Sequence, residues 1–200
     1  MGRIFSIIPA AGRSNRMGRP KQLLDISGRP MLLAVVDPIA ASALVQDVVV
    51  VTNSLVAPSL NLDQPKVRVV INDDPKADMI DSLRKALTHL QEQEGLVDSD
   101  GVLICPGDQP GLSVDDIELC CQTFLRNQDR IVIATHQGKR GHPLIFPASM
   151  VPLVMSDACA NGLRSLPQAH DDRVVTTECQ SDAVLRNVNS PDDYDRLPPA

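Results

Sequence analysis

The stretch Ile4 to Leu24, IFSIIPAAGRSNRMGRPKQLL, decides how the rest of the chain is interpreted. It opens with a short apolar run, Ile4 to Ile8, which is bounded by Pro9 and has the length and β-branched content of a buried strand. In a following loop of small residues, backbone N–H groups can approach an anion closely. The density of glycine and positive charge favours a polyphosphate site over a solvated basic loop after an edge strand. The small residues are Ala10, Ala11, Gly12, Ser14 and Gly18, and the cations are Arg13, Arg16, Arg19 and Lys21.

Two common phosphate-binding motifs do not match this loop. A Walker A motif needs Gly-Lys followed by Ser or Thr, whereas Lys21 lies between Pro20 and Gln22. The dinucleotide-binding motif needs three glycines at a fixed spacing that Gly12 and Gly18 do not provide. Pro20 also argues against a helix that starts at once. The loop therefore belongs to another class of phosphate site.

The composition predicts one globular domain over residues 1–200 with an aliphatic core. The chain is 43% hydrophobic and 22% charged, and its aromatic residues are three Phe and one Tyr. Base-stacking platforms are therefore scarce, and the net charge of −6 opposes nonspecific nucleic-acid binding. Residues 1–30 nevertheless carry six basic side chains against Asp25 alone. A local basic patch on an acidic protein indicates a site for a small anion.

The five cysteines indicate a reducing compartment. They form no C-x-x-C pair and show no metal-ligand spacing with the four histidines, which is typical of reduced structural thiols. The N-terminal apolar run is too short for a signal peptide. No segment approaches the ~20 apolar residues that a membrane helix needs. We therefore expect a cytoplasmic protein that binds neither nucleic acid nor membrane.

Apolar runs alternate with amphipathic segments along the chain. Further strands are expected over 47–52, 67–71, 101–105, 130–135 and 144–146, and near Val174 and Val184. Helices are expected from Pro30 with a kink or break at Pro38, over 79–90, from an N-cap at Ser113 to 125, over 161–170, and from Pro191. The segment from Gly138 to Pro143 is expected as a loop. This alternation predicts a Rossmann-like, three-layer α/β/α domain with a mainly parallel sheet.

Asp108 follows the expected strand 101–105, in the turn Pro106-Gly107-Asp108-Gln109-Pro110. In parallel sheets, ligands bind beyond the carboxyl ends of the strands, so Asp108 and the basic loop are expected to share one crevice. Mg²⁺ is bound by few carboxylates together with phosphate oxygens, which suits Asp108 in this position. The alternative is an aspartate that only stabilises its turn.

The segment AAGRSNRMGRPKQLL resembles the signature loop of nucleotidyltransferases that use an NTP and release pyrophosphate. It is most similar to the MobA-like group, which contains the molybdenum-cofactor cytidylyl- and guanylyltransferases. The resemblance runs from Ile4 to Asp193 and implies a fold of the nucleotide-diphospho-sugar transferase type. The loop is also similar to that of the methylerythritol phosphate cytidylyltransferases. Those carry a His-Asp-Ala-Ala-Arg motif where this chain has Pro-Gly-Asp-Gln-Pro, which favours the molybdenum-cofactor branch.

The resemblance also implies roles for particular residues. Lys21, Arg13 and Arg16 would be the catalytic cations, and Asp108 with Asn189 would hold Mg²⁺. The alternative for this C-terminal segment is that Ser190 and Pro191, with the following pair of aspartates, only begin a terminal helix. Further implied nucleotide-binding residues are Ala10, Ala11, Gly12, Ser14, Met17, Gly18, Asn72 and Ser82. The implied acceptor-binding residues are Arg140, Gly141, His142 and Pro143, although a lone histidine is more often structural. Asp78 stands where the family usually has Gly before its Met-x-x-Ser motif.

The function implied is Mg²⁺-dependent transfer of a nucleotidyl group from an NTP to a phosphate-bearing acceptor. CTP is the expected donor, because the guanylyl branch typically has Ala-Gly-Gly where this chain has Ala10-Ala11-Gly12. Molybdopterin or its molybdenum-loaded form is the expected acceptor, with a molybdoenzyme as a further partner. Two alternatives stay open: a sugar- or polyol-phosphate nucleotidyltransferase, and a non-catalytic cofactor-binding chaperone with the same fold.

Overall fold

A seven-stranded sheet forms the centre of the computed structural model, which describes residues 2–12, 14 and 18–197. Its strand order is β5-β4-β1-β6-β8-β7-β9, and all neighbouring strands are parallel except those that pair with β8. A separate antiparallel ribbon consists of β2 and β3. The strands are β1 (Ile4–Pro9), β2 (Asp25–Ile26), β3 (Arg29–Pro30), β4 (Asp47–Thr52), β5 (Val67–Ile71), β6 (Gly101–Ile104), β7 (Ile131–His136), β8 (Lys139–Pro147) and β9 (Val174–Glu178).

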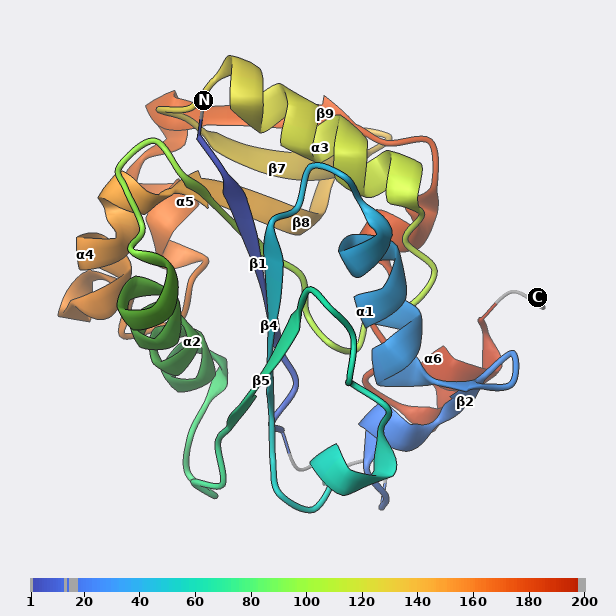
Figure 1. The fold of residues 1–200 in the computed structure, drawn as a ribbon. Coiled ribbons are helices and arrows are strands. Elements are labelled where there is room, and N and C mark those ends of the chain that lie inside the picture. Colours follow the sequence, from blue (N-terminus) through green and yellow to red (C-terminus); the bar gives the residue numbers. More distant parts are fainter. Residues whose placement is uncertain (1, 13, 15–17, 198–200) are drawn as a thin grey trace.

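Helices cover both faces of this sheet (Figure 1). The first and third helices pack on one face, and the second, fourth and fifth pack on the other. The mainly parallel, three-layer α/β/α architecture predicted from the sequence is thereby confirmed. The helices are α1 (Met31–Ala41), α2 (Met79–Glu94), α3 (Val114–Arg126), α4 (Val151–Met155), α5 (Ser165–Ala169) and α6 (Pro191–Asp195).

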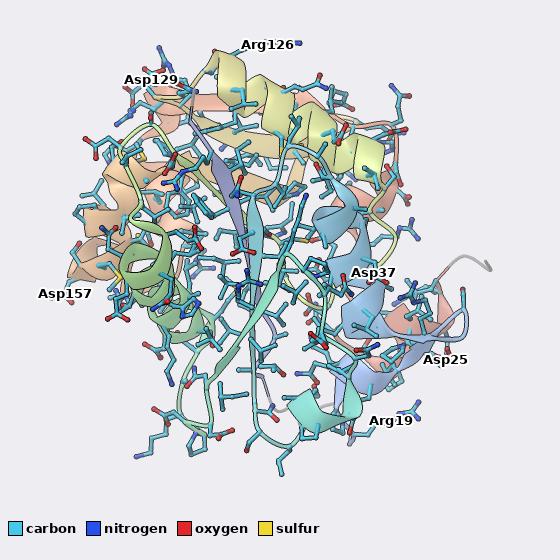
Figure 2. The ribbon with its side chains drawn as sticks, in the orientation of Figure 1. Arg19, Asp25, Asp37, Arg126, Asp129 and Asp157 are labelled. Carbon is cyan, nitrogen blue, oxygen red and sulfur yellow. The ribbon has the colours of Figure 1, made fainter. Side chains whose placement is uncertain are left out.

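Alternate side chains of each central strand supply the two halves of the aliphatic core. In β1, Ile4 and Ile8 pack with α1 and α3, whereas Phe5 and Ile7 pack with α2. Because both faces are covered, the central strands are nearly continuous apolar runs. The labelled side chains of Arg126, Asp129 and Asp157 lie at the periphery (Figure 2). Among the described helices, none has the length and apolarity needed to cross a bilayer.

The first helix is continuous through Pro38, so of the expected kink or break, the break is wrong. Pro38 lies inside α1, which ends three residues later at Ala41. A proline removes one backbone hydrogen bond from a helix and crowds the preceding turn. Val35, Val36 and Ile39 are nevertheless fully buried around it. Burial of this apolar face therefore outweighs the local cost of the proline.

β8 begins at Lys139, so the expected loop from Gly138 to Pro143 is wrong, and the strand expected over 144–146 is confirmed but is longer than predicted. Gln137 and Gly138 have φ values of 51° and 73°. Positive φ at both central residues is the signature of the type I′ turn that joins antiparallel strands directly. β8 then pairs with β7 on one side and β6 on the other. As a result, the start of β8 lies beside the carboxyl end of β6.

Two expectations for the C-terminal third are also wrong. The segment Asp182–Leu185 is a 3₁₀ turn instead of a strand, and the helix expected over 161–170 is limited to α5. Ser181 caps the turn by accepting a hydrogen bond from the N–H of Ala183 (3.0 Å). The Gln109 amide donates to the Ala183 carbonyl (2.9 Å). These contacts bury Val184 in a turn, and a short apolar run alone does not distinguish a turn from a strand.

Candidate active site

The candidate site lies where the loops after β1 and β6 meet. The two strands are parallel neighbours, with Ile7 opposite Ile104, so both loops leave from one edge of the sheet. The N–H of Gly107 donates to the carbonyl of Pro9 (3.2 Å). A Cβ at Gly107 would lie 2.7 Å from the Cβ of Ala10. Glycine is therefore required at position 107 by the close approach of the two loops.

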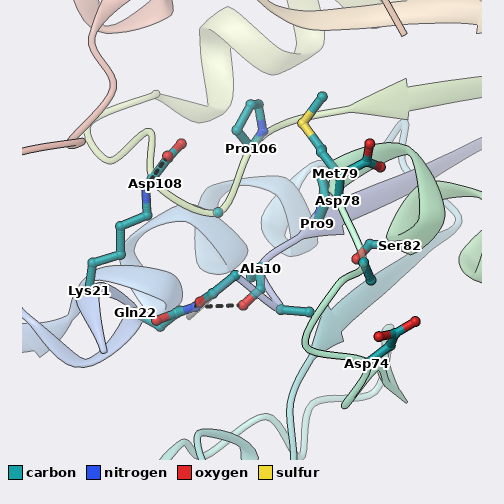
Figure 3. A pocket seen from close by; sticks show the side chains of 14 residues that line it. Pro9, Ala10, Lys21, Gln22, Asp74, Asp78, Met79, Ser82, Pro106 and Asp108 are labelled. Atoms are coloured by element: carbon teal, nitrogen blue, oxygen red, sulfur yellow. Dashed lines mark hydrogen bonds and ion pairs between the residues drawn. The ribbon is translucent and has the colours of Figure 1, made fainter. Parts of the chain in front are cut away.

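A cavity of about 260 Å³ opens between these loops and the start of α2 (Figure 3). Lys21 and Asp108 lie at one end of it, and Asp74, Asp78 and Ser82 lie at the other. The remaining lining residues are Pro9, Ala10, Ala11, Gly12, Gln22, Ala77, Met79, Pro106 and Gly107. One end of the cavity thus holds the Lys21–Asp108 ion pair, and the other end, beside α2, holds the carboxylates of Asp74 and Asp78.

Two buried amide side chains fix the first loop. The Gln22 Nε2 group donates to the carbonyls of Ala10 and Gly12, each at 2.7 Å. Asn53 donates to the carbonyl of Ala11 (3.1 Å). A carbonyl and the next N–H point to opposite sides of a trans peptide plane. Holding the carbonyls of Ala10 and Ala11 therefore directs the N–H groups of Ala11 and Gly12 away from these amides.

The ammonium of Lys21 lies among three oxygen atoms. Its Nζ is 2.5 Å from Oδ2 of Asp108, 3.1 Å from the carbonyl oxygen of Val188 and 3.3 Å from Oδ1 of Asn189. The N–H of Val188 also donates to the backbone carbonyl of Asp108 (2.8 Å). Residues far apart in the sequence, from the first loop, the loop after β6 and the C-terminal segment, thus meet at one point.

Asp108 has the features expected of a metal ligand. Its Oδ1 is buried and has no hydrogen-bond partner among the described residues. A bare carboxylate oxygen is costly to bury, so it suits a site that a bound cation completes. The described residues contain no cluster of three or more His, Cys, Asp or Glu that would enclose a metal alone. One carboxylate and one amide oxygen, completed by phosphate oxygens, fit a hard cation such as Mg²⁺.

At the opposite end of the cavity, backbone N–H groups at the N-terminus of α2 already have hydrogen-bond acceptors within the chain. Asp78 accepts hydrogen bonds from the N–H groups of Ile80 (2.9 Å) and Asp81 (3.2 Å). The Asp81 carboxylate accepts from the N–H of Asp78 (3.0 Å), which completes a capping box. Asp78 has extended backbone angles, so no glycine geometry is needed there. These carboxylates disfavour an anion at this end of the cavity, whereas Lys21 supplies a positive charge at the other end.

The segment from Gly141 to Pro143 lies at the same edge of the sheet as Asp108. Leu144 is opposite Ile104, which places His142 beyond the carboxyl end of β6. Burial lowers the pKa of the half-buried His142, although the Asp108 carboxylate opposes the shift. A Cβ at Gly141 would lie 1.9 Å from the carbonyl oxygen of Val184, so glycine is required there.

The structure brings Lys21, Asp108 and Asn189 together beside the loop residues Ala10, Ala11 and Gly12, whereas several other sequence-predicted residues lie away from the cavity or outside the described part of the chain. Arg13, Arg16 and Met17 lie outside the described residues. Arg140 forms an exposed ion pair with Asp171 (2.9 Å) and does not line the cavity. Ser14 accepts a hydrogen bond from the N–H of Lys21 (3.1 Å). Elsewhere, the Asn72 amide donates to the hydroxyl of Ser82 (3.1 Å), and both side chains are buried.

Sequence reasoning missed the positioning roles of Gln22 and Asn53. Gln22 stands directly after Lys21, and Asn53 follows the strand 47–52 at the same edge of the sheet. A polar side chain next to a predicted phosphate loop was the available signal. Asn53 also lines a second hollow of about 540 Å³, which shares Ala11, Gly12 and Asp74 with the first cavity.

Comparison with known families gives a match over most of the chain. Residues 6–174 match the model of the MobA-like NTP transferase domain. The structure is also similar to the crystal structure of Rv0371c from Mycobacterium tuberculosis H37Rv, with a TM-score of 0.78, 24% identity and 98% of each chain covered. The complex of Rv0371c with manganese gives a TM-score of 0.72 at 22% identity, with 98% of this chain and 97% of that chain covered. At these identities the likeness concerns the fold.

Two curated relatives match a shorter part of the chain than the family model does. The 3-deoxy-manno-octulosonate cytidylyltransferase of Francisella tularensis subsp. novicida is 28% identical over 132 residues, which are 66% of this chain and 50% of that protein. The 2-C-methyl-D-erythritol 4-phosphate cytidylyltransferase of Frankia casuarinae is 36% identical over 98 residues, 48% of this chain and 36% of that protein. The chain therefore spans half or less of the length of these relatives.

Proposed function

The chain belongs to the MobA-like NTP transferase family, and from this membership and the geometry of the site we propose that it is a nucleotidyltransferase. The proposed reaction transfers a nucleotidyl group from an NTP, preferably CTP, to an oxygen of an anionic acceptor, and pyrophosphate leaves. The observation that carries this proposal is the meeting of Lys21, Asp108 and Asn189 at one end of a cavity lined by the first loop.

In the proposed reaction the protein orients the phosphates and stabilises charge. An acceptor oxygen attacks the α-phosphorus in line, and negative charge develops on the departing phosphates. Lys21 supplies a cation at this end of the cavity, and the N–H groups of Ala11 and Gly12 supply fixed dipoles. Arg13 and Arg16 are proposed as further phosphate-binding cations from their place in the sequence. No nucleophilic side chain is required.

Asp108 and Asn189 are the proposed ligands of Mg²⁺ or Mn²⁺. A bound divalent cation would neutralise phosphate charge at this end of the cavity. The buried, unpartnered Oδ1 of Asp108 supports this assignment. The manganese complex of Rv0371c is consistent with a divalent cation in a protein of this fold.

We propose a sugar acid or polyol phosphate as the class of acceptor. The curated relatives are named for an octulosonate and for an erythritol 4-phosphate, so they support the sugar or polyol alternative better than molybdopterin. Molybdopterin is a second candidate, carried by the segment from Gly141 to Pro143, which resembles that of the cofactor cytidylyltransferases and lies at the Asp108 edge.

Pyrophosphate release tests both the proposed transferase activity and the proposed class of acceptor. The protein is incubated with CTP and Mg²⁺ and with one acceptor at a time: an octulosonate, methylerythritol phosphate or molybdopterin. We expect acceptor-dependent pyrophosphate release with a sugar-type acceptor and none when EDTA removes the metal. Release with molybdopterin alone would overturn the acceptor class and leave the transferase intact. NTP binding without release for any acceptor would favour the chaperone alternative.

A further inference from the structure

Lys21 contacts both residues that are proposed to hold the metal. Its Nζ lies 2.5 Å from Oδ2 of Asp108 and 3.3 Å from Oδ1 of Asn189, and the Val188 carbonyl oxygen completes the set at 3.1 Å. The Lys21 and Asp108 side chains are 19% and 16% exposed, so the pair is largely screened from water. A lysine ammonium surrounded by three oxygen atoms occupies the kind of position that a small cation takes.

We propose that Lys21 holds the metal position in the nucleotide-free protein and competes with the divalent cation for Asp108 and Asn189. This inference rests on the proposed function, which assigns the two residues to a metal. Two cations within about 3 Å of each other repel strongly in a partly buried site, so both cannot share these ligands. Entry of the metal therefore requires the ammonium to leave.

The cavity offers the ammonium another position. Lysine is a compact charge on a flexible four-carbon stem, and Lys21 lines the cavity at the end proposed for the phosphates. A triphosphate would stabilise the displaced ammonium there, whereas the nucleotide-free cavity contains no such anion. Metal alone is then expected to bind weakly, and metal with nucleotide to bind with positive coupling. By linkage, each would raise the affinity for the other by the same factor.

Mn²⁺ binding in the absence of nucleotide tests this inference without any reaction. Free Mn²⁺ is measured by electron paramagnetic resonance during titration of the wild type, of Lys21→Met and of Arg19→Met. Methionine keeps an unbranched side chain and removes the charge. Arg19 is exposed and lies in the same loop, so its variant controls for the loss of one positive charge nearby (Figure 2).

We expect Lys21→Met to bind Mn²⁺ about tenfold or more tightly than the wild type, in the range of typical coupling factors. Arg19→Met should stay within about twofold, because exposed charges are screened. Adding Asp108→Asn to Lys21→Met should abolish the gain. Equal affinities for Lys21→Met and the wild type would overturn the competition. An equal gain in Arg19→Met would also overturn it, because the effect would then be general.

Thermal unfolding provides a second measurement in case Lys21→Met is less stable than the wild type. Removing Lys21 leaves Asp108 buried without its cation, so Mn²⁺ should raise the melting temperature of Lys21→Met more than that of the wild type. A smaller increase in the variant would contradict the proposal. Wild-type pyrophosphate release is measured separately, so failure of the proposed function is distinguishable from failure of the competition.

Discussion

Gln22 fixes the described part of the first loop through several hydrogen bonds. Its side chain is 2% exposed and donates to two loop carbonyls, while its Oε1 accepts a hydrogen bond from Ser14 (3.3 Å). Its neighbour Lys21 makes the electrostatic contacts, but the position of Lys21 follows from the loop that Gln22 shapes. At this scale, binding and stability therefore depend on the same few side chains.

Replacing Gln22 by Met should lower both stability and nucleotide affinity. Methionine has a similar length but no donor, so the carbonyls of Ala10 and Gly12 would lose their partner at a cost of about 1–3 kcal/mol in the free energy of unfolding. Urea unfolding measures this change, and NTP titration measures the loss of affinity. Gln64→Met is the matched control, because half-buried Gln64 donates one hydrogen bond to Asp37. Equal effects of the two substitutions would contradict the role given to Gln22.

Lys21→Ala should lower the turnover number by roughly 10²- to 10³-fold, which is the usual cost of losing one fixed electrostatic stabiliser. Steady-state pyrophosphate release gives the rate, and circular dichroism checks the fold. Arg126→Ala, which removes an exposed charge at the end of α3, serves as the control and should retain the activity. Turnover within a factor of three of the wild type in Lys21→Ala would show that its contact with Asp108 is structural.

At the scale of elements, the ends of β1, α2 and β6 are held together by one ion pair. The Arg3 guanidinium donates to Asp100 and to the carbonyls of Glu94 (3.3 Å) and Gly95 (3.1 Å) at the end of α2. Burial alone would raise the pKa of Asp100. The hydrogen bonds from Arg3 and from the N–H of Val97, with the charge of Arg3, outweigh burial and hold that pKa below its usual value.

Arg3→Met should therefore destabilise the protein in a pH-dependent way. The folded-state pKa of Asp100 lies below its unfolded value, so the pair's contribution is complete above about pH 4 and is lost as pH falls through the folded-state pKa. We expect a loss of about 1–3 kcal/mol at pH 7 that shrinks below pH 4, measured by urea unfolding at several pH values. Arg196→Met removes an exposed pair with Asp193 and should change stability little. A pH-independent loss for Arg3→Met would contradict this assignment.

The elements that could be predicted from the sequence are those whose local signals agree with their packing. The strand bounds 47–52 and 67–71 and the Ser113 cap match the structure, because apolar runs and cap chemistry are local. Pro38 and the start of β8 were missed for the opposite reason. Burial around Pro38 and the pairing of β8 with two strands come from distant residues, and no local pattern encodes them.

At the scale of the whole molecule, the strand order explains where the site lies. The chain passes from β1 outward through β4 and β5, then returns to place β6 on the other side of β1. β1 and β6 are therefore neighbours where the strand order reverses, and ligands in such sheets bind at the carboxyl ends of the strands beside that point. Strand–helix alternation predicted this edge of the sheet. It did not predict which strands are neighbours, so the meeting of Lys21 with Asn189 rested on the family resemblance.

The preference among nucleotides should be visible in the stability of the whole protein. A ligand at 100 times its Kd adds about 2.7 kcal/mol to the free energy of unfolding. For a chain of this size, that corresponds to a rise of roughly 5–10 °C in Tm. With Mg²⁺ present, we expect CTP to give the largest rise of the four NTPs. The half-buried Ala11 lines both hollows, and we expect its methyl group to leave less space for a purine than for a pyrimidine.

The matched variant Ala11→Gly removes that methyl group without changing charge. One methyl group discriminates by only ~1–3 kcal/mol, so the variant should reduce the preference for CTP over GTP without reversing it. Thermal unfolding of the wild type and Ala11→Gly with each NTP measures both effects in one experiment. A larger rise with GTP than with CTP in the wild type would overturn the proposed donor. If the difference between the CTP and GTP rises in Tm is unchanged in Ala11→Gly, the base is selected by other residues. Asn72 and Ser82 are then the next residues to vary, because their hydrogen-bonded side chains are buried beside the acidic end of the cavity.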